Sequence, residues 1–182
     1  ESEVYHKEIP KVSWDNSLVT DHYRFFYRAM LPPSGERSLV GAIIPQNIAH
    51  TNGIRSYIFS DLREGVIFFS YTTSILFDFI VKITGRSNLH NMLDDFPFDK
   101  MPLLSNELIL RTLLLNCVSQ NYSNIWKDLW INDYDKYTWT KRDYRLNDDL
   151  FLSITENWSD ATLLRSVFSR RQALIEIDVI TA

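Results

Sequence analysis

The stretch HYRFFYRAML, residues 22–31, decides the fold class of this chain. It is rich in aromatic residues, which favour a β-strand, and the loop PPSG at residues 32–35 ends it. Two further strands are predicted downstream: SLVGAII at residues 38–44, ended by Pro45, and GIRSYIFS at residues 53–60. The first half of the chain is therefore predicted to contain a small mixed β-sheet.

Helical patterns follow the predicted strands. Apolar residues recur at three- and four-residue steps over residues 66–80, which predicts one helix, and Gly85 is expected to end it in the left-handed conformation. The second half predicts a long helix over residues 106–129, with Ser105 as its cap, and a final helix over residues 160–179. We therefore expect an α+β fold: a small mixed sheet with one packed helix, followed by an α-helical region.

The chain is expected to divide near residue 99. Residues 1–99 are predicted to form an α/β module, and residues 100–182 a helical region packed on it. Residues 132–147 lack periodicity and are expected to be a surface excursion with Trp139 as an exposed anchor. Trp126, Trp130 and Trp158 are expected in the core or at an interface rather than as base-stacking platforms. The chain opens without methionine and stops within the apolar stretch EIDVITA, so we expect a piece of a longer protein.

Composition places the chain among ordinary globular proteins. Hydrophobic residues make up 45% and charged residues 23% of its 182 residues. The single cysteine, Cys117, cannot form an internal disulfide, which favours a reducing compartment. No uninterrupted apolar run reaches the roughly 18–20 residues that a membrane span needs, so no membrane partner is expected.

The net charge of −4 argues mildly against a nucleic-acid partner. The charge is unevenly distributed, however: residues 21–90 contain seven Lys and Arg residues against five Asp and Glu residues. A locally basic face on an acidic protein is therefore compatible with the sequence.

Several enzyme classes lack their motifs. No G-x-G occurs among the five glycines, so neither a dinucleotide fingerprint nor a P-loop can form. One cysteine and four scattered histidines give no zinc-site spacing. The acidic pairs Asp94-Asp95 and Asp148-Asp149 are interpreted as solvated charges or helix caps rather than metal ligands, so no catalytic, cofactor-binding or metal-binding residue is predicted in this chain.

The stretch from RFFYRAM to ERSLVGAIIPQNIAH, residues 24–50, resembles the opening of the target-recognition region of adenine-specific DNA methyltransferases. These belong to type IIG-like restriction–modification systems and to phage-defence systems such as DISARM and BREX. In that family an R-x-I/M stretch precedes a D/E-R-T/S strand and A-x-I-P, which match residues 28–30, 36–38 and 42–45 here. The tail LRSVFSRRQALIEIDVITA, residues 164–182, extends the resemblance to the end of the chain.

The resemblance implies that the chain is the sequence-specificity domain of an adenine-N6 DNA methyltransferase in the bacterial cytoplasm. It implies that S-adenosylmethionine binds in the catalytic domain of the same parent chain and not in this fragment. The expected partners are double-stranded DNA, that catalytic domain, and nuclease or other defence subunits. The alternative is a docking module without direct DNA contact, which the acidic C-terminal half and its aromatic residues favour.

Two polar loops carry most of the candidate DNA-binding residues. Arg, Asn and Gln side chains can make two-point contacts with bases, and cations bind phosphates. The candidates are Asn47, His50, Asn52 and Arg55 in the loop at residues 46–55, and Lys82, Arg86, Asn88 and His90 in the loop at residues 82–91.

Three further arginines leave alternatives open. Arg37 is expected either to reach phosphate or to pair with Glu36 or Asp61. Arg170 and Arg171 are expected to form a salt bridge with Glu176 or Asp178, with a phosphate clamp as the alternative.

Overall fold

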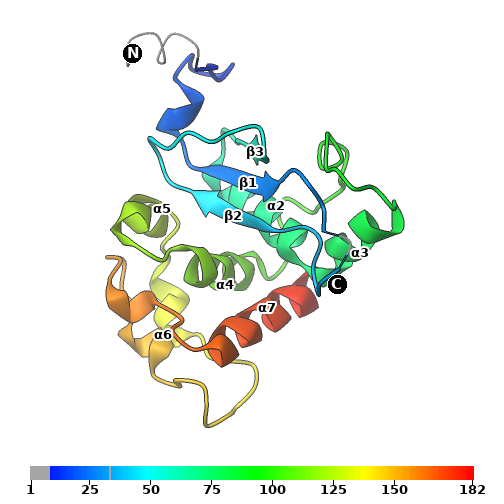
Figure 1. The fold of residues 1–182 in the computed structure, drawn as a ribbon. Coiled ribbons are helices and arrows are strands. Elements are labelled where there is room, and N and C mark those ends of the chain that lie inside the picture. The colour runs from blue at the N-terminus through cyan, green and yellow to red at the C-terminus, as the bar shows by residue number, and fades with distance from the viewer. Residues whose placement is uncertain (1–8, 33) are drawn as a thin grey trace.

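The computed structural model describes residues 9–32 and 34–182. Its sheet contains β1 (Arg24–Arg28), β2 (Gly41–Ile44) and β3 (Ile54–Tyr57) in the order β2-β1-β3 (Figure 1). The three predicted strands are confirmed, each shorter than expected. Both outer strands pair with β1 in the antiparallel direction, so the sheet is antiparallel rather than mixed. Because β2 and β3 therefore run the same way, the connection at residues 45–53 must carry the chain from one end of the sheet to the other.

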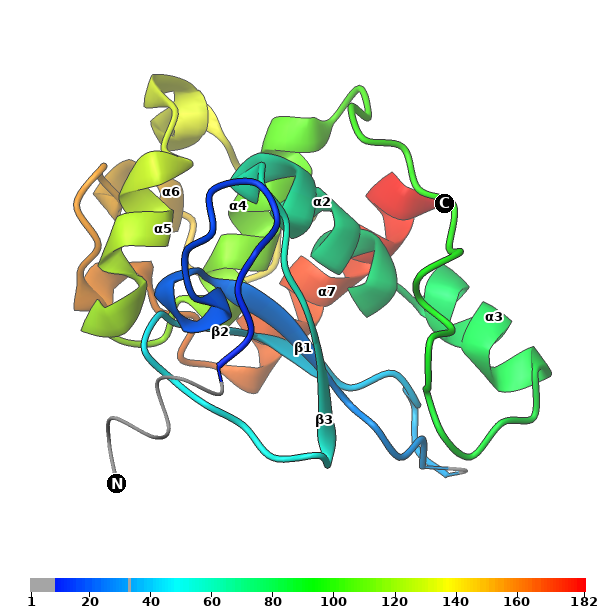
Figure 2. The same ribbon diagram turned by 90° about the horizontal axis from the view of Figure 1, so that it is seen from above.

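One face of the sheet packs against the helices. Phe25 and Tyr27 of β1 point toward α2 (Leu62–Thr73), where the Tyr27 hydroxyl lies 2.6 Å from the Thr72 hydroxyl. Gly65 of α2 permits this close approach, because a Cβ atom there would lie 2.4 Å from Cε2 of Phe25. Figure 2 shows the helices on this side and the 45–53 connection on the other.

The predicted helix at residues 66–80 is two helices. Ser74 has an extended backbone between α2 and α3 (Ile75–Ile83), and its side chain accepts the N–H of Phe77 as the cap of α3. The two helix axes are bent by 64° at this break. Gly85 follows α3 with φ of +64°, as expected for a left-handed helix end.

The helical half contains α4 (Ser105–Asn116), α5 (Ser123–Asp128), α6 (Leu150–Ser153) and α7 (Val167–Thr181). The prediction of one helix over residues 106–129 is wrong, since α4 stops at Asn116. The Asn116 side chain donates to the carbonyl of Thr112 and accepts the N–H of Ile43 in β2. The last helix begins at Val167 rather than near residue 160, and Ser166 caps it. Short 3-10 turns lie at Val19–Asp21, Gln120–Tyr122, Asn132–Lys136 and Asp160–Thr162.

The two halves of the chain share one hydrophobic core. α4 packs between α2 and α7, and the core cluster includes Phe25 and Phe69 as well as Trp126 and Ile177. Trp139 is also buried and donates to the carbonyl of Asn147, so the expectation of an exposed anchor is wrong. Burial confirms Trp126 as a core residue, while Trp130 and Trp158 are half-buried against the core.

Within the described part of the chain, no single helix has the length and apolar character needed to cross a membrane. α2 and α3 meet these criteria only as a pair, bent at Ser74.

Candidate nucleic-acid interface

The two polar loops predicted from the sequence meet at Ala29, just beyond the end of β1. The N–H of Ala29 donates to the carbonyl of Gly53 at 2.9 Å, and its own carbonyl accepts the N–H of Leu89 at 2.8 Å. The N–H of Leu31 then donates to the carbonyl of Ser87 at 2.9 Å. The loop at residues 82–91 thus continues the sheet beyond the start of β3, along the same edge of β1 as Asn52 and Gly53.

We call the surface around this meeting point the Ala29 junction. Its exposed or partly exposed polar residues come from the end of β1, the start of β3 and both loops. They are Arg28, Asn52, Arg55, Arg86, Asn88 and His90.

Local hydrogen bonds fix the second loop. Asn88 forms a β-bridge with Met30, and its side-chain oxygen accepts the N–H of His90 at 3.2 Å. His90 has φ of +44°, a conformation that the bridge and this hydrogen bond hold in place. The loop is therefore a rigid extension of the sheet, with the Asn88 oxygen already occupied and its amide nitrogen able to donate.

Arg28 belongs to this surface although loop-based reasoning from the sequence missed it. Successive strand residues point to opposite faces, so Arg28 lies on the face opposite to the buried Phe25 and Tyr27. Its side chain is exposed at the last position of β1. The alternation of side chains between the two faces, continued to the end of the predicted strand, is the sequence signal that would have identified Arg28.

The first loop is divided between two ends of the sheet. The N–H of Asn47 donates to the carbonyl of Thr20, at the end of the sheet where β1 begins. β1 has five residues, which at about 3.3 Å per residue separates the two ends by about 13 Å. Asn47 is therefore not brought together with the Ala29 junction.

His50 and Arg55 face different sides of β3. A ring nitrogen of His50 lies 2.8 Å from the Ser56 hydroxyl, and its other ring nitrogen lies 3.1 Å from the carbonyl of Thr51. Arg55 is opposite Tyr27 in the register, so it lies at the edge of the sheet on the face of Tyr27, whereas Ser56 and Arg28 lie on the opposite face. His50 therefore holds the crossing loop against β3, while Arg55 is exposed.

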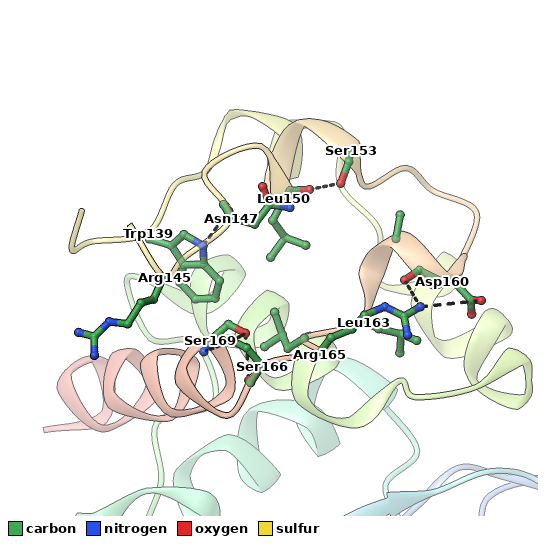
Figure 3. A pocket seen from close by; sticks show the side chains of 12 residues that line it. Trp139, Arg145, Asn147, Leu150, Ser153, Asp160, Leu163, Arg165, Ser166 and Ser169 are labelled. Atoms are coloured by element: carbon green, nitrogen blue, oxygen red, sulfur yellow. Dashed lines mark hydrogen bonds and ion pairs between the residues drawn. The ribbon is translucent and has the colours of Figure 1, made fainter. Parts of the chain in front are cut away.

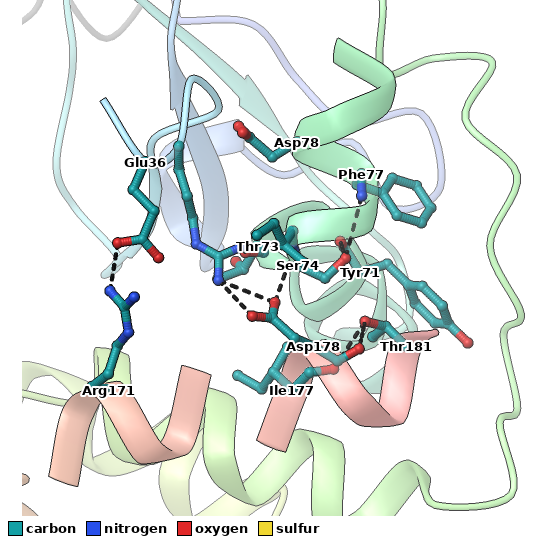
Figure 4. Close-up of polar contacts among 12 residues, drawn as sticks. Glu36, Tyr71, Thr73, Ser74, Phe77, Asp78, Arg171, Ile177, Asp178 and Thr181 are labelled. Carbon is teal, nitrogen blue, oxygen red and sulfur yellow. Dashed lines mark hydrogen bonds and ion pairs between the residues drawn. The ribbon is translucent and has the colours of Figure 1, made fainter. Parts of the chain in front are cut away.

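Lys82 and Arg37 are committed to contacts inside the protein, and Figure 4 shows the Asp178 carboxylate that accepts from Arg37. Lys82 lies 3.0 Å from the carboxylate of Asp78 and donates to the carbonyl of Glu36 at 2.7 Å. Arg37 donates to both carboxylate oxygens of Asp178, at 2.8 and 3.1 Å, and to the carbonyl of Thr73. Both cations thus tie the 35–39 segment to α3 and α7. Arg37 does not pair with Glu36 or Asp61, the two partners expected from the sequence.

The arginines of α7 also have partners other than those expected. Arg171 pairs with Glu36, and Arg170 donates to the carbonyl of Leu115. The expected acids are used elsewhere, because Glu176 pairs with Arg111 in the core and Asp178 pairs with Arg37.

Acidic residues border the Ala29 junction without neutralising its arginines. Burial raises the pKa of Tyr57, and so do the hydrogen bond that its hydroxyl donates to Asp94 and the negative charge of that carboxylate, so Asp94 is engaged by the phenol. Asp95 lines a hollow of about 520 Å³ with Arg86 and His90. Within residues 9–32 and 34–182, no ion pair or hydrogen bond is found for the guanidinium groups of Arg28, Arg55 or Arg86.

Other hollows of similar size lie away from the Ala29 junction. One of about 390 Å³ lies between α6 and the start of α7 (Figure 3), where Arg145 and Arg165 pair with Asp143 and Asp160. Across the described ranges, no group of three His, Cys, Asp or Glu side chains is placed to hold a metal ion.

Comparisons with protein-family models, with curated proteins and with solved structures found no match to this chain. The candidate interface therefore depends on its own geometry and on the sequence resemblance described above.

Proposed function

We propose that the chain is a DNA-recognition domain and that the Ala29 junction is its contact surface for duplex DNA. The observation that carries the proposal is the meeting of two polar loops on the backbone of Ala29, with the exposed Arg28 and Arg55 on the two faces of this sheet edge and the exposed Arg86 in the second loop. Arginine binds phosphates and guanine, and asparagine binds adenine, which are the contacts that a sequence-reading surface needs.

The more specific part of the proposal follows from the sequence resemblance. The domain supplies target specificity to an S-adenosylmethionine-dependent adenine-N6 DNA methyltransferase of a bacterial restriction–modification or phage-defence system. Methyl transfer and cofactor binding belong to the catalytic domain of the parent chain. This domain grips and orients the duplex, while the target adenine leaves the stack to reach the catalytic pocket.

Salt dependence tests the contact with DNA directly. If Arg28, Arg55 and Arg86 each neutralise one phosphate, log K should fall with log salt with a slope of about −2.7, and replacing one of them with alanine should reduce the slope by about 0.9. Fluorescence anisotropy with a labelled duplex at several salt concentrations measures both quantities.

A matched control is available on the opposite side of the molecule. Arg142 is exposed in the 140–147 segment, which lies below α7 in Figure 1, far from the sheet. Arg142→Ala removes the same charge and should leave the slope unchanged. Absence of duplex binding at low salt, or equal effects of all four substitutions, would contradict the proposed surface.

An apolar surface on α3 favours docking as a second candidate function. Ile75, Leu76, Phe79 and Ile83 lie on one side of this helix and are 40–66% exposed. Exposed apolar stripes of this kind commonly mark protein interfaces. Phe79→Asp should weaken co-purification with the catalytic domain of the parent chain and leave the affinity for duplex DNA unchanged; the reverse pattern would contradict this role.

A further inference from the structure

The turn at residues 84–87, which we call the ridge, is exposed and contributes to the lining of two hollows. All four of its residues are exposed, and three of them, Thr84, Gly85 and Ser87, have small side chains or none. A hollow of about 400 Å³ between the turn and Leu31 includes Arg86 in its lining, and so does the hollow of about 520 Å³ beside His90. Arg86 is thus the one long side chain of the ridge.

The ridge is held at both of its ends. On the helix side, the N–H of Gly85 donates to the carbonyl of Lys82 at 3.1 Å, and the N–H of Arg86 lies 3.3 Å from the Thr84 hydroxyl. On the sheet side, the Ser87 carbonyl accepts the N–H of Leu31. Gly85 supplies the left-handed φ of +64° that the turn requires. The backbone position of Arg86 is therefore set before DNA binds.

We propose that this ridge enters the minor groove of an A·T-rich segment of the DNA and that Arg86 is the residue that reads it. The inference rests on the proposed function and assigns a groove and a base composition to its contact surface. The minor groove is about 6 Å wide, so it admits a thin turn, whereas the major groove, about 12 Å wide, admits a helix or a two-stranded ribbon.

The chemistry of the turn agrees with the minor groove. Narrow A·T-rich minor grooves have an enhanced negative potential, which attracts an arginine inserted between the two phosphate backbones. Thr84, Gly85 and Ser87 carry neither the amide nor the carboxylate groups that distinguish bases in the major groove.

Three duplexes that differ only in one short central segment test the inference. The segment is built from A·T pairs, from G·C pairs, or from inosine·cytosine pairs, which lack the guanine 2-amino group and so present an A·T-like minor groove with a G·C-like major groove. We expect the A·T and inosine·cytosine duplexes to bind alike and the G·C duplex to bind about tenfold more weakly. Because the position of the segment within the binding site is not known in advance, it is moved stepwise along the duplex.

Variants assign the preference to Arg86. Arg86→Ala should abolish the difference between the duplexes, while Arg142→Ala should preserve it. Thermal melting of both variants checks folding, and Arg86→Gln serves as a second variant that keeps a long polar side chain without the charge.

The outcomes separate the inference from the proposed function. If the inosine·cytosine duplex binds like the G·C duplex at every position, or if all three bind equally, minor-groove reading by Arg86 is wrong while DNA binding stands. If Arg86→Ala retains the preference, another residue reads the groove and the assignment is wrong. If none of the duplexes binds at low salt, the proposed function itself fails.

Discussion

Arg37 and Asp178 form a two-point ion pair across 141 residues of sequence, with nitrogen–oxygen distances of 2.8 and 3.1 Å. The same carboxylate also accepts the N–H of Ile75 at the start of α3. One aspartate of α7 therefore holds both the segment before β2 and the first turn of α3. A residue that the sequence presented as a candidate phosphate contact is part of the scaffold.

We expect Arg37→Ala to lower the free energy of unfolding by about 2 kcal/mol, because it removes charged hydrogen bonds that are largely shielded from water. Urea denaturation measures the loss. Arg171→Ala is the matched control, since its pair with Glu36 is about half exposed and should contribute less than about 1 kcal/mol. Equal losses of unfolding free energy for the two variants would contradict the greater contribution assigned to the buried Arg37–Asp178 pair.

The buried pair Arg111–Glu176 should make stability depend on pH. Burial acts to raise the pKa of Glu176, but hydrogen bonds from Gln172, Arg111 and Thr140, together with the Arg111 charge, outweigh it and lower the pKa below its ordinary value of 4.5. A lowered folded-state pKa means that the carboxylate contributes stability that is complete above about pH 4.5 and is lost as the pH falls through the folded-state pKa.

At pH 7, Glu176→Gln should cost about 3 kcal/mol, since it leaves the Arg111 charge buried without its counter-ion. The difference between the variant and the wild type should shrink as the pH falls below 4.5. Urea unfolding of both proteins at several pH values between neutral and acidic measures the trend. A difference that stays constant with pH would contradict the assigned ionisation.

Gly65→Ala should destabilise the protein although alanine favours helices. A Cβ atom at residue 65 would lie 2.4 Å from Phe25 Cε2 and 3.1 Å from Phe59, so the contact between β1 and α2 must open. Overpacking of this kind costs about 1–3 kcal/mol, which exceeds the gain of about 1 kcal/mol in helix propensity. Gly53→Ala is the control, because only the Thr51 hydroxyl lies within 4.0 Å of the new atom. Unchanged stability of Gly65→Ala would mean that α2 lies farther from the sheet than the structure shows.

The thiol of Cys117 should be unreactive in the folded protein. Its side chain is 1% exposed, and burial raises the pKa of the thiol, which disfavours the reactive thiolate. A colorimetric thiol reagent should therefore modify the chain only in denaturant, at a rate that follows global unfolding. Rapid labelling under native conditions would be incompatible with the packing of α4.

The strands could be predicted from the sequence because aromatic stretches bounded by Pro and Gly are local signals. The helix boundaries depended on contacts made elsewhere. In the sequence, Ser74 is a small residue within the apolar pattern of one predicted helix. In the structure, its side chain caps α3 and so divides that helix in two. Asn116 likewise ends α4 through a hydrogen bond to Ile43, which is distant in sequence.

The candidate interface was predictable in composition and not in arrangement. Both loops were identified by their amides and arginines, but their meeting at Ala29 depends on the strand order β2-β1-β3, which is a matter of long-range pairing. The same pairing excludes Asn47, which lies at the other end of β1, and adds Arg28. Arg37 was indistinguishable in sequence from a free cation, because its acidic partner Asp178 is distant in sequence on α7, whereas the i, i+4 spacing of Asp78 and Lys82 was a local signal for their ion pair.

The hydrogen bonds at Ala29 and Leu31 join main-chain atoms only, and every residue except proline carries those atoms. Positions 52, 55 and 86 can therefore exchange their side chains without loosening the attachment of either loop. A library randomised at these three positions should consist largely of folded members, so new binding preferences can arise from few substitutions. The scaffold thus separates main-chain contacts that must be kept from side chains that can vary, which is the property that the proposed recognition function requires.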